Sequence, residues 1–209
     1  MKPRTRNPEE TRQRLIDATI TLVLGQGYAA TTVDQICAES GLTKGGFFHH
    51  FANKEAIGRA TIARWGEIGT SLYSPAWYDE TSDPLVRIGR FLSIMAGFTE
   101  REAICTCVVG MMSQEISQSH ESMRADAARE LAHWTKETAR LFALAKEKHH
   151  PAADFDPEEI AWFLNSLWQG SMLVGKATAD PKMIRRNLEF ARTWIAGFFP
   201  ENLRHLLNA

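Results

Sequence analysis

The sequence predicts an all-α protein in which a small N-terminal three-helix unit precedes a larger helical body. Apolar residues recur at helical spacing along most of the chain, as at Ile57, Trp65, Ile68 and Leu72. An Asn or Asp followed by proline, a pair typical of helix starts, occurs repeatedly. No stretch alternates apolar and polar residues over a strand length, so the sequence predicts no β-strand.

The Asx-Pro pairs place the beginnings of four helices. In the first, Asn7 can cap the helix, Pro8 suits its first position, and Glu10 stands where a capping box has an acidic side chain. Gly25 and Gly27 are expected to end this helix. The other three pairs are Asp83-Pro84, Asp156-Pro157 and Asp180-Pro181.

Residues 31–51 have the spacing of a helix-turn-helix motif. Thr31 can cap a helix that has Asp34 three residues later. Gly41 can end that helix in a left-handed conformation, and Thr43 can cap the next helix. In such a motif the second helix enters the major groove of DNA, with its N-terminal residues closest to the bases.

Two adjacent glycines, Gly45 and Gly46, fall in the first turn of this second helix, although glycine costs about 1 kcal/mol relative to alanine inside a helix. Without side chains the backbone can approach phosphates or base edges, and the free N–H groups favour an anion. Phe47 and Phe51 are expected to anchor the helix in the core. A frayed helix end stays an alternative interpretation of the glycines.

Charge separates the first third of the chain from the remainder. Residues 1–64 carry nine Lys and Arg against six Asp and Glu, a net +3, whereas residues 65–209 carry fifteen against nineteen, a net −4. A basic N-terminal part suits a chain whose N-terminal end meets a polyanion. The sequence has no apolar run long enough to cross a membrane and no signal peptide, and its three cysteines argue against a disulfide framework, so a cytoplasmic location is expected.

Catalytic and metal-binding patterns are missing from the sequence. The pairs His49-His50 and His149-His150 would point to different sides of a helix, so neither grips one ion easily. The sequence has no glycine-rich phosphate loop after a strand, no Cys-x-x-Cys and no nucleophile elbow. We therefore expect no enzymatic activity, no metal and no cofactor.

The stretch TRQRLIDATITLVLGQGYAATTVDQICAESGLTKGGFFHHFANKEAI, residues 11–57, has a Thr-Thr pair, a Gly-Leu-Thr-Lys-Gly turn and a Phe-x-x-Lys-Glu junction. It resembles the DNA-binding domain of the TetR/AcrR family of bacterial transcriptional regulators. The resemblance implies a DNA-binding domain at residues 1–53 and a ligand-binding and dimerisation domain at residues 54–209. It further implies a homodimer on a palindromic operator of double-stranded DNA, most simply a repressor that a small-molecule inducer releases.

The same resemblance implies DNA contacts residue by residue. The positions are Thr31 or Thr32 at a helix start near phosphate, Thr43, Lys44, Gly45 and Gly46 at the reading end of the recognition helix, then His49 and His50, and Lys54 at a phosphate. Phe48 departs from the family pattern, which usually has tyrosine at this position. Phenylalanine has no hydroxyl to donate to a phosphate, so a neighbouring histidine takes over the contact or the affinity is lower.

Residues 101–117, REAICTCVVGMMSQEIS, resemble over a short span the segment GCLxGNLxxE of a family branch that includes repressors responsive to reactive electrophiles. Met111 stands in place of the asparagine. Cys105 and Cys107 are therefore candidate electrophile sensors, and packing in the core is the alternative interpretation. On a helix the two thiols diverge by about 200° and will not readily bridge.

The helical body offers candidates for an inducer pocket and for a dimer interface. The pocket candidates are Phe91, Met95, Phe98, Cys105, Met111, Met112, Trp134, Phe163, Trp168 and Met172. They favour an apolar or aromatic inducer, although such residues are also common in plain core. The last two long helices are apolar on two sides, so they are expected to form a four-helix dimer interface. The interface candidates are Ile160, Leu164, Leu167, Ser171, Ile184, Leu188, Ala191 and Ile195.

A second interpretation is a helical ligand-binding or scaffold protein that retains this fold without specific DNA recognition. The phenylalanine at position 48 and the small excess of positive charge favour it. Selection of bound sequences from random DNA separates the two interpretations.

Overall fold

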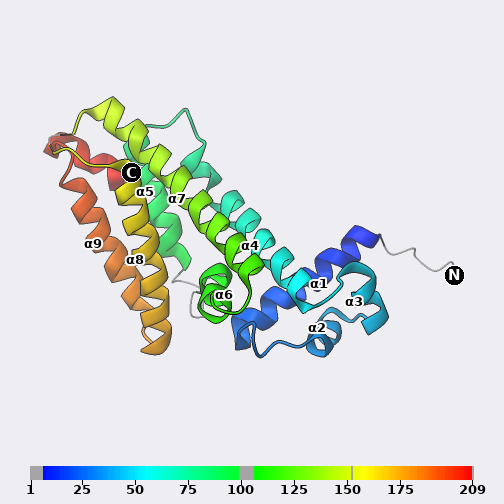
Figure 1. The fold of residues 1–209 in the computed structure, drawn as a ribbon. Helices are drawn as coiled ribbons and strands as arrows, with labels where there is room; N and C mark the ends of the chain where they lie inside the picture. Colours follow the sequence, from blue (N-terminus) through cyan, green and yellow to red (C-terminus); the bar gives the residue numbers. More distant parts are fainter. Residues whose placement is uncertain (1–6, 99–105, 152, 209) are drawn as a thin grey trace. The chain divides into compact units, whose positions relative to one another are not determined.

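The computed structural model describes residues 7–98, 106–151 and 153–208. Within them the secondary structure is helical, and no β-strand occurs in these ranges, which confirms the predicted all-α class (Figure 1). The elements are α1 Pro8–Gln26, α2 Val33–Ser40, α3 Lys44–His50, α4 Lys54–Trp77, α5 Pro84–Gly97, α6 Val108–Ile116, α7 Glu121–His149, α8 Pro157–Ala177, α9 Lys182–Ala196 and the 3-10 helix η2 Glu201–Asn208. None of the described helices is both long enough and apolar enough to span a bilayer.

The chain forms two compact units. The N-terminal unit comprises residues 1–67 and 107–130, and the C-terminal unit comprises residues 68–106 and 131–209. The long helices α4 and α7 each contribute to both units. The domain boundary expected between residues 53 and 54 stays a prediction, and α6 belongs to the same compact unit as α1, α2 and α3.

Three of the four Asx-Pro helix starts are confirmed. Asn7, Asp83 and Asp156 each accept a hydrogen bond from a backbone N–H of the first turn, and each is followed by a proline at the first helical position. The fourth helix begins one residue later than expected, at Lys182. Asp180 still accepts a hydrogen bond from the Lys182 N–H, at 3.1 Å.

Only one of the two glycines expected to end α1 does so. Gly27 has a φ of +86°, a conformation that favours glycine, and it follows the last helical residue. Gly25 lies inside α1, and its expected role as a stop signal is wrong. Among the described residues, nothing outside the helix's own backbone lies within 4 Å of where a Cβ on Gly25 would be.

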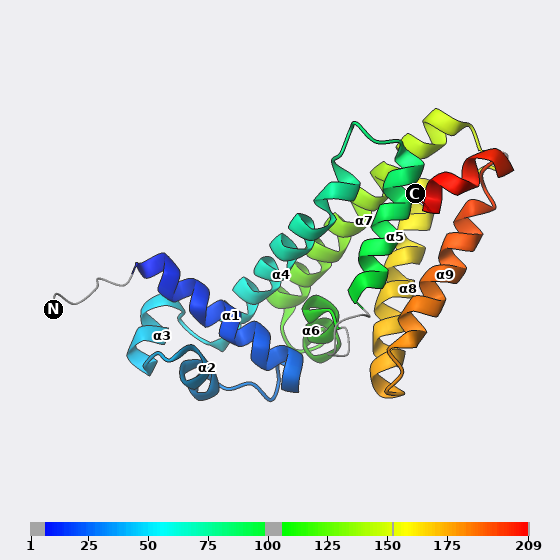
Figure 2. The same ribbon diagram turned by 180° about the vertical axis from the view of Figure 1, so that it is seen from behind.

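In the C-terminal unit, α8 and α9 lie side by side, and α5 packs against both α9 and η2 (Figures 1 and 2). At Gly89 of α5 an added Cβ would collide with the backbone carbonyl of Leu207 in η2. Arg192 of α9 binds at the same point, because its guanidinium donates to the carbonyl of Leu207 in η2 and to that of Gly89 in α5. The C-terminal 3-10 helix is therefore fixed against α5 by a glycine and an arginine.

Candidate nucleic-acid interface

The first helix of the helix-turn-helix motif, α2, begins with a capping box. The Thr32 hydroxyl accepts from the Gln35 N–H at 3.2 Å, and the Gln35 side chain accepts from the Thr32 N–H at 2.9 Å. The expectation that Thr31 caps this helix is wrong, since its hydroxyl donates to the carbonyl of Gly27 and its side chain is 1% exposed. Of the two threonines, only Thr32 is exposed at the helix start.

The turn between α2 and α3 has the predicted geometry. Gly41 adopts a left-handed conformation with a φ of +65°, and the Leu42 N–H donates a hydrogen bond to the carbonyl of Cys37 at 2.9 Å. Thr43 caps α3 by accepting the Gly46 N–H at 3.1 Å. Local chemistry that the sequence alone indicates therefore ends α2 and begins α3.

Two buried phenylalanines fix α3 on the N-terminal unit, as predicted. Phe47 is fully buried, and Phe51 is nearly so. Their rings lie 5.9 Å apart, and the guanidinium of Arg12 lies over the Phe51 ring at 5.3 Å. The opposite face of α3 therefore points outward in a defined orientation.

That outward face is side-chain-poor at its N-terminal end. An added Cβ on Gly45 or Gly46 would meet only the Thr43 hydroxyl, at 3.8 and 3.6 Å, which is ordinary van der Waals contact. Neither glycine has a positive φ. Internal packing and backbone conformation thus do not require glycine here. Farther along the face, Phe48 is 55% exposed and His49 is exposed.

The lysines expected at DNA have partners within the chain. Lys44 pairs with Asp34 at 2.7 Å on the surface, and this hydrogen bond raises the pKa of Lys44. Lys54 donates to the carbonyl of Ala29 at 3.1 Å and lies 4.4 Å above the ring of Tyr28. Burial lowers the pKa of Lys54, while the carboxylate of Glu115 acts in the opposite direction.

Glu115 of α6 is not among the site residues predicted from the sequence, and its side chain connects α6 to the loop between α1 and α2. Its carboxylate accepts the backbone N–H groups of Tyr28 and Ala29, at 3.2 and 2.5 Å. A signal for it was present in the sequence, because Glu115 occupies the glutamate position of the GCLxGNLxxE-like segment.

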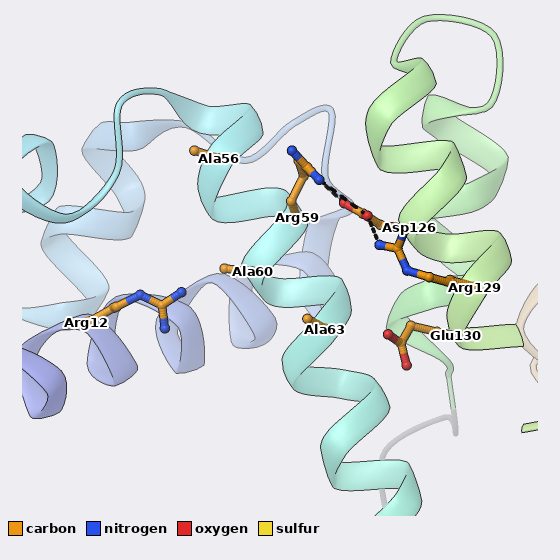
Figure 3. A pocket seen from close by; sticks show the side chains of 8 residues that line it. All are labelled: Arg12, Ala56, Arg59, Ala60, Ala63, Asp126, Arg129 and Glu130. Carbon is orange, nitrogen blue, oxygen red and sulfur yellow. Dashed lines mark hydrogen bonds and ion pairs between the residues drawn. The ribbon is translucent and has the colours of Figure 1, made fainter. Parts of the chain in front are cut away.

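A hollow of about 380 Å³ lies in the N-terminal unit among α1, α4 and α7 (Figure 3). Its lining residues are Arg12, Ala56, Arg59, Ala60, Ala63, Asp126, Arg129 and Glu130. At its centre Asp126 accepts from Arg59 at 2.5 Å and from Arg129, and the bond from Arg59 lowers the pKa of Asp126. Because Arg59 and Arg129 already form ion pairs with Asp126, we interpret the cluster as a set of ion pairs that links α4 to α7.

Some of the pocket candidates meet in the C-terminal unit. Phe91 and Trp134 lie 5.2 Å apart between ring centroids. They form one aromatic cluster with Tyr73 and Trp77, two residues that are not among the predicted pocket candidates. Phe98 and Trp168 form a separate pair at 5.7 Å, and Met95 and Met172 are buried in the same unit.

Other pocket candidates do not join this cluster. Met111 and Met112 belong to the N-terminal unit, and Cys105 lies outside the described residues. Cys107 caps α6, and its thiol accepts the Gly110 N–H at 3.5 Å. Phe163 is exposed beside Trp194, at 4.9 Å between ring centroids, and its place in an inducer pocket stays a prediction.

The predicted interface residues of α8 and α9 require a correction. Seven of them are buried within the chain itself: Ile160, Leu164, Ser171, Ile184, Leu188, Ala191 and Ile195. Leu167 is half-buried. Both helices have apolar residues on two sides, and the sequence pattern does not indicate which side faces the core. The exposed apolar face consists instead of Trp162, Phe163, Leu173, Val174, Phe190 and Trp194.

Comparison with known proteins identifies the family. A family model described as bacterial regulatory proteins, tetR family, matches residues 15–61, and one described as tetracyclin repressor-like, C-terminal domain, matches residues 84–191. The transcriptional regulator AcuR of Cereibacter sphaeroides is 30% identical over 183 residues, which cover 87% of this chain and 82% of AcuR. The chain belongs to the TetR family of transcriptional regulators.

Further TetR-family proteins match over most of their length. The HTH-type transcriptional repressor DhaR of Mycobacterium sp. is 25% identical over 162 residues, covering 78% of this chain and 80% of DhaR. The crystal structure of a regulatory protein TetR from Rhodobacter sphaeroides superposes with a TM-score of 0.79 at 28% identity, covering 87% of this chain and 96% of that chain. TetR-family regulators are generally DNA-binding repressors that form dimers and bind a ligand, and they are not enzymes.

Proposed function

We propose that this TetR-family chain is a repressor that binds a near-palindromic operator as a homodimer and is released by an apolar or aromatic inducer. The observation that carries the proposal is the glycine pair in the first turn of α3, of which Gly45 is exposed and Gly46 is half-buried. Gly45 and Gly46 weaken the helix without any packing or conformational need inside the chain. An external partner that approaches the backbone closely explains them, and the major groove of DNA is such a partner.

The proposed DNA contacts follow from exposure on α2 and α3. Thr43, Lys44 and His49 supply the polar groups beside the glycine pair, and Thr32 replaces the buried Thr31 as the phosphate contact at the start of α2. Phe48 presents a half-exposed ring with no polar group, which suits a thymine methyl or a sugar rather than a phosphate. His50 and Lys54 stay candidates for contacts to the DNA backbone, and Lys54 also donates to the carbonyl of Ala29.

The proposed dimer uses the exposed apolar face of α8 and α9 defined above. A contiguous apolar surface of this kind marks an interaction site on a protein. Gly170 lies on α8 with nothing within 4 Å of its would-be Cβ, so a partner helix can approach closely there. In a twofold symmetric dimer the two recognition helices must meet half-sites about 34 Å apart, one turn of DNA.

The DNA-binding part of the proposal is tested by selecting bound sequences from a random double-stranded pool and measuring affinity for the enriched sequence. We expect an inverted repeat, and we expect Lys44→Ala to weaken binding about tenfold and to lower the salt slope by about 1. Lys136→Ala, an exposed lysine of α7, is the matched control. A selection that enriches no sequence supports the alternative of a helical ligand-binding protein without specific DNA recognition.

The proposed inducer site is the aromatic cluster of Tyr73, Trp77, Phe91 and Trp134. Among the described residues, the indole N–H of Trp77 has no hydrogen-bond acceptor although the side chain is 2% exposed. A buried donor without a partner is uncommon and costs free energy, so an acceptor on a ligand would be favourable there. The inducer we propose is therefore an aromatic molecule with one hydrogen-bond acceptor.

This inducer class is tested by measuring release of the operator with aromatic compounds that differ only in a carbonyl or hydroxyl acceptor. We expect Trp77→Phe to remove the preference for the acceptor while leaving operator affinity without compound unchanged. A reactive electrophile is the alternative inducer. If it acts through the thiol that caps α6, Cys107→Ser will abolish release by thiol-reactive compounds.

The proposed coupling runs through α4. This helix starts in the N-terminal unit at Lys54 and continues into the C-terminal unit, where it carries Tyr73 and Trp77. An inducer that displaces these aromatic rings would tilt α4 and change the separation of the two recognition helices in the dimer. Unchanged operator affinity at saturating inducer would contradict this coupling.

A further inference from the structure

The loop between α1 and α2 contains a backbone site that a carboxylate of α6 occupies. Two consecutive N–H groups, those of Tyr28 and Ala29, donate to the same Glu115 side chain at 3.2 and 2.5 Å. The helix α6 packs against α1 in this unit (Figure 1). Glu115 lies near the C-terminal end of α6 and reaches the loop from there. Charge-assisted hydrogen bonds of this kind are stronger than neutral ones.

The loop is shaped around that carboxylate. Gly27 has a φ of +86°, and a Cβ on it would lie 2.5 Å from Oε1 of Glu115. The backbone conformation at position 27 thus favours glycine, and the missing Cβ leaves room for the carboxylate beside it. The two N–H groups belong to no helix, so without Glu115 they would have no partner inside the described part of the chain.

The atoms that Glu115 holds are connected directly to the DNA-facing elements. The carbonyl of Ala29 accepts from Lys54 at the start of α4, and the Tyr28 hydroxyl donates to the carbonyl of Lys54 at 3.2 Å. The carbonyl of Gly27 accepts from the Thr31 hydroxyl at 2.7 Å, immediately before the cap of α2. One carboxylate therefore orders the segment between the end of α1 and the beginning of α2.

We propose that Glu115 is a positioning residue for DNA recognition, which holds residues 27–29 so that α2 and the start of α4 are presented to the operator in one fixed geometry. This inference rests on the proposed function, because the effect of Glu115 is measured as affinity for the operator. Glu115 touches no DNA in this account. It acts through the backbone of Tyr28 and Ala29, and through Lys54.

The test compares Glu115→Ala, Glu115→Gln and the wild-type full-length chain. Amide hydrogen exchange at Tyr28 and Ala29 should accelerate about tenfold in Glu115→Ala, while exchange at Phe47 in the core stays unchanged. Affinity for the operator selected with the wild-type chain should fall about fivefold or more at unchanged oligomeric state. Glu115→Gln keeps an acceptor oxygen of the same shape and should recover part of both effects. Gln114→Ala is the matched control, since this neighbouring side chain is exposed and donates to the Gly110 carbonyl of its own helix.

Each other outcome overturns the inference. Unchanged exchange at the two amides would mean that Glu115 does not hold the loop. Faster exchange with unchanged operator affinity would mean that the loop does not position the DNA-facing elements. Faster exchange that extends to Phe47 would reveal a general contribution to stability. Failure of the proposed function is distinguishable, because it would appear as a wild-type chain that selects no operator.

Discussion

Replacing Gly45 by alanine is predicted to stabilise the protein and to weaken its binding to DNA. The added Cβ would lie 3.8 Å from the Thr43 hydroxyl and near nothing else outside its own helix backbone, so it meets no clash. The backbone φ is not positive, so alanine introduces no strain. Alanine should therefore raise the free energy of unfolding by about 0.5–1 kcal/mol, the difference in helix propensity.

The opposite effect is expected at the operator. In the proposed complex, a methyl group at the N-terminal end of α3 would hold the helix backbone away from the base edges or phosphates of the groove. We expect the dissociation constant to rise about tenfold, equivalent to about 1.4 kcal/mol. Thermal unfolding followed by circular dichroism gives the first quantity, with an expected rise of about 1–4 °C in Tm. Fluorescence anisotropy with the selected operator gives the second.

Gly25→Ala is the matched control for this prediction. Gly25 lies in α1 of the same unit, has a helical conformation and also has open space around its would-be Cβ. It should raise Tm by a similar amount and leave operator affinity unchanged. Operator affinity within twofold of wild type for Gly45→Ala would refute the reasoning, because the glycine pair would then mark only a helix start. A fall in Tm would refute the premise that the site is open.

Three further predictions concern assembly, packing and pH. Phe190→Glu, on the exposed face of α9, should convert the dimer to a monomer in analytical ultracentrifugation, and an unchanged dimer would locate the interface elsewhere. Gly89→Ala should lower the free energy of unfolding by about 1–3 kcal/mol in denaturant titrations, because its Cβ collides with the backbone of Leu207, whereas Gly97→Ala on the same helix has open space and should not. The hydrogen bond from Arg59 lowers the pKa of Asp126 below its ordinary value of 3.8. The ionised Asp126 carboxylate therefore stabilises the folded chain above about pH 4, and this stabilisation is lost as the pH falls through the lowered pKa. Asp126→Asn should therefore be less stable than wild type at pH 6, and the gap should close below pH 4; a constant gap would contradict this.

Local sequence signals determined much of the N-terminal unit. Caps, turns and anchors depend on residues within a few positions of one another, so Asn7, Gly41, Thr43 and Phe47 could be assigned from spacing alone. The helix-turn-helix motif and the family resemblance follow from the same short-range information. The choice between Thr31 and Thr32 was not available locally, because either hydroxyl can cap a helix and only the packing of the loop buries one of them.

Tertiary structure decided which face of each helix is buried and which distant residues meet. The pattern of α8 and α9 predicts two apolar sides, but their packing within the chain buries Leu164 and Ile195 and exposes Trp162 and Phe190. Helical periodicity fixes a residue's angle around its own axis and not the direction of the core. Glu115 also bonds the backbone of residues 28 and 29, more than eighty positions earlier in the chain. No local pattern specifies these bonds, because they form only once α6 has packed against α1.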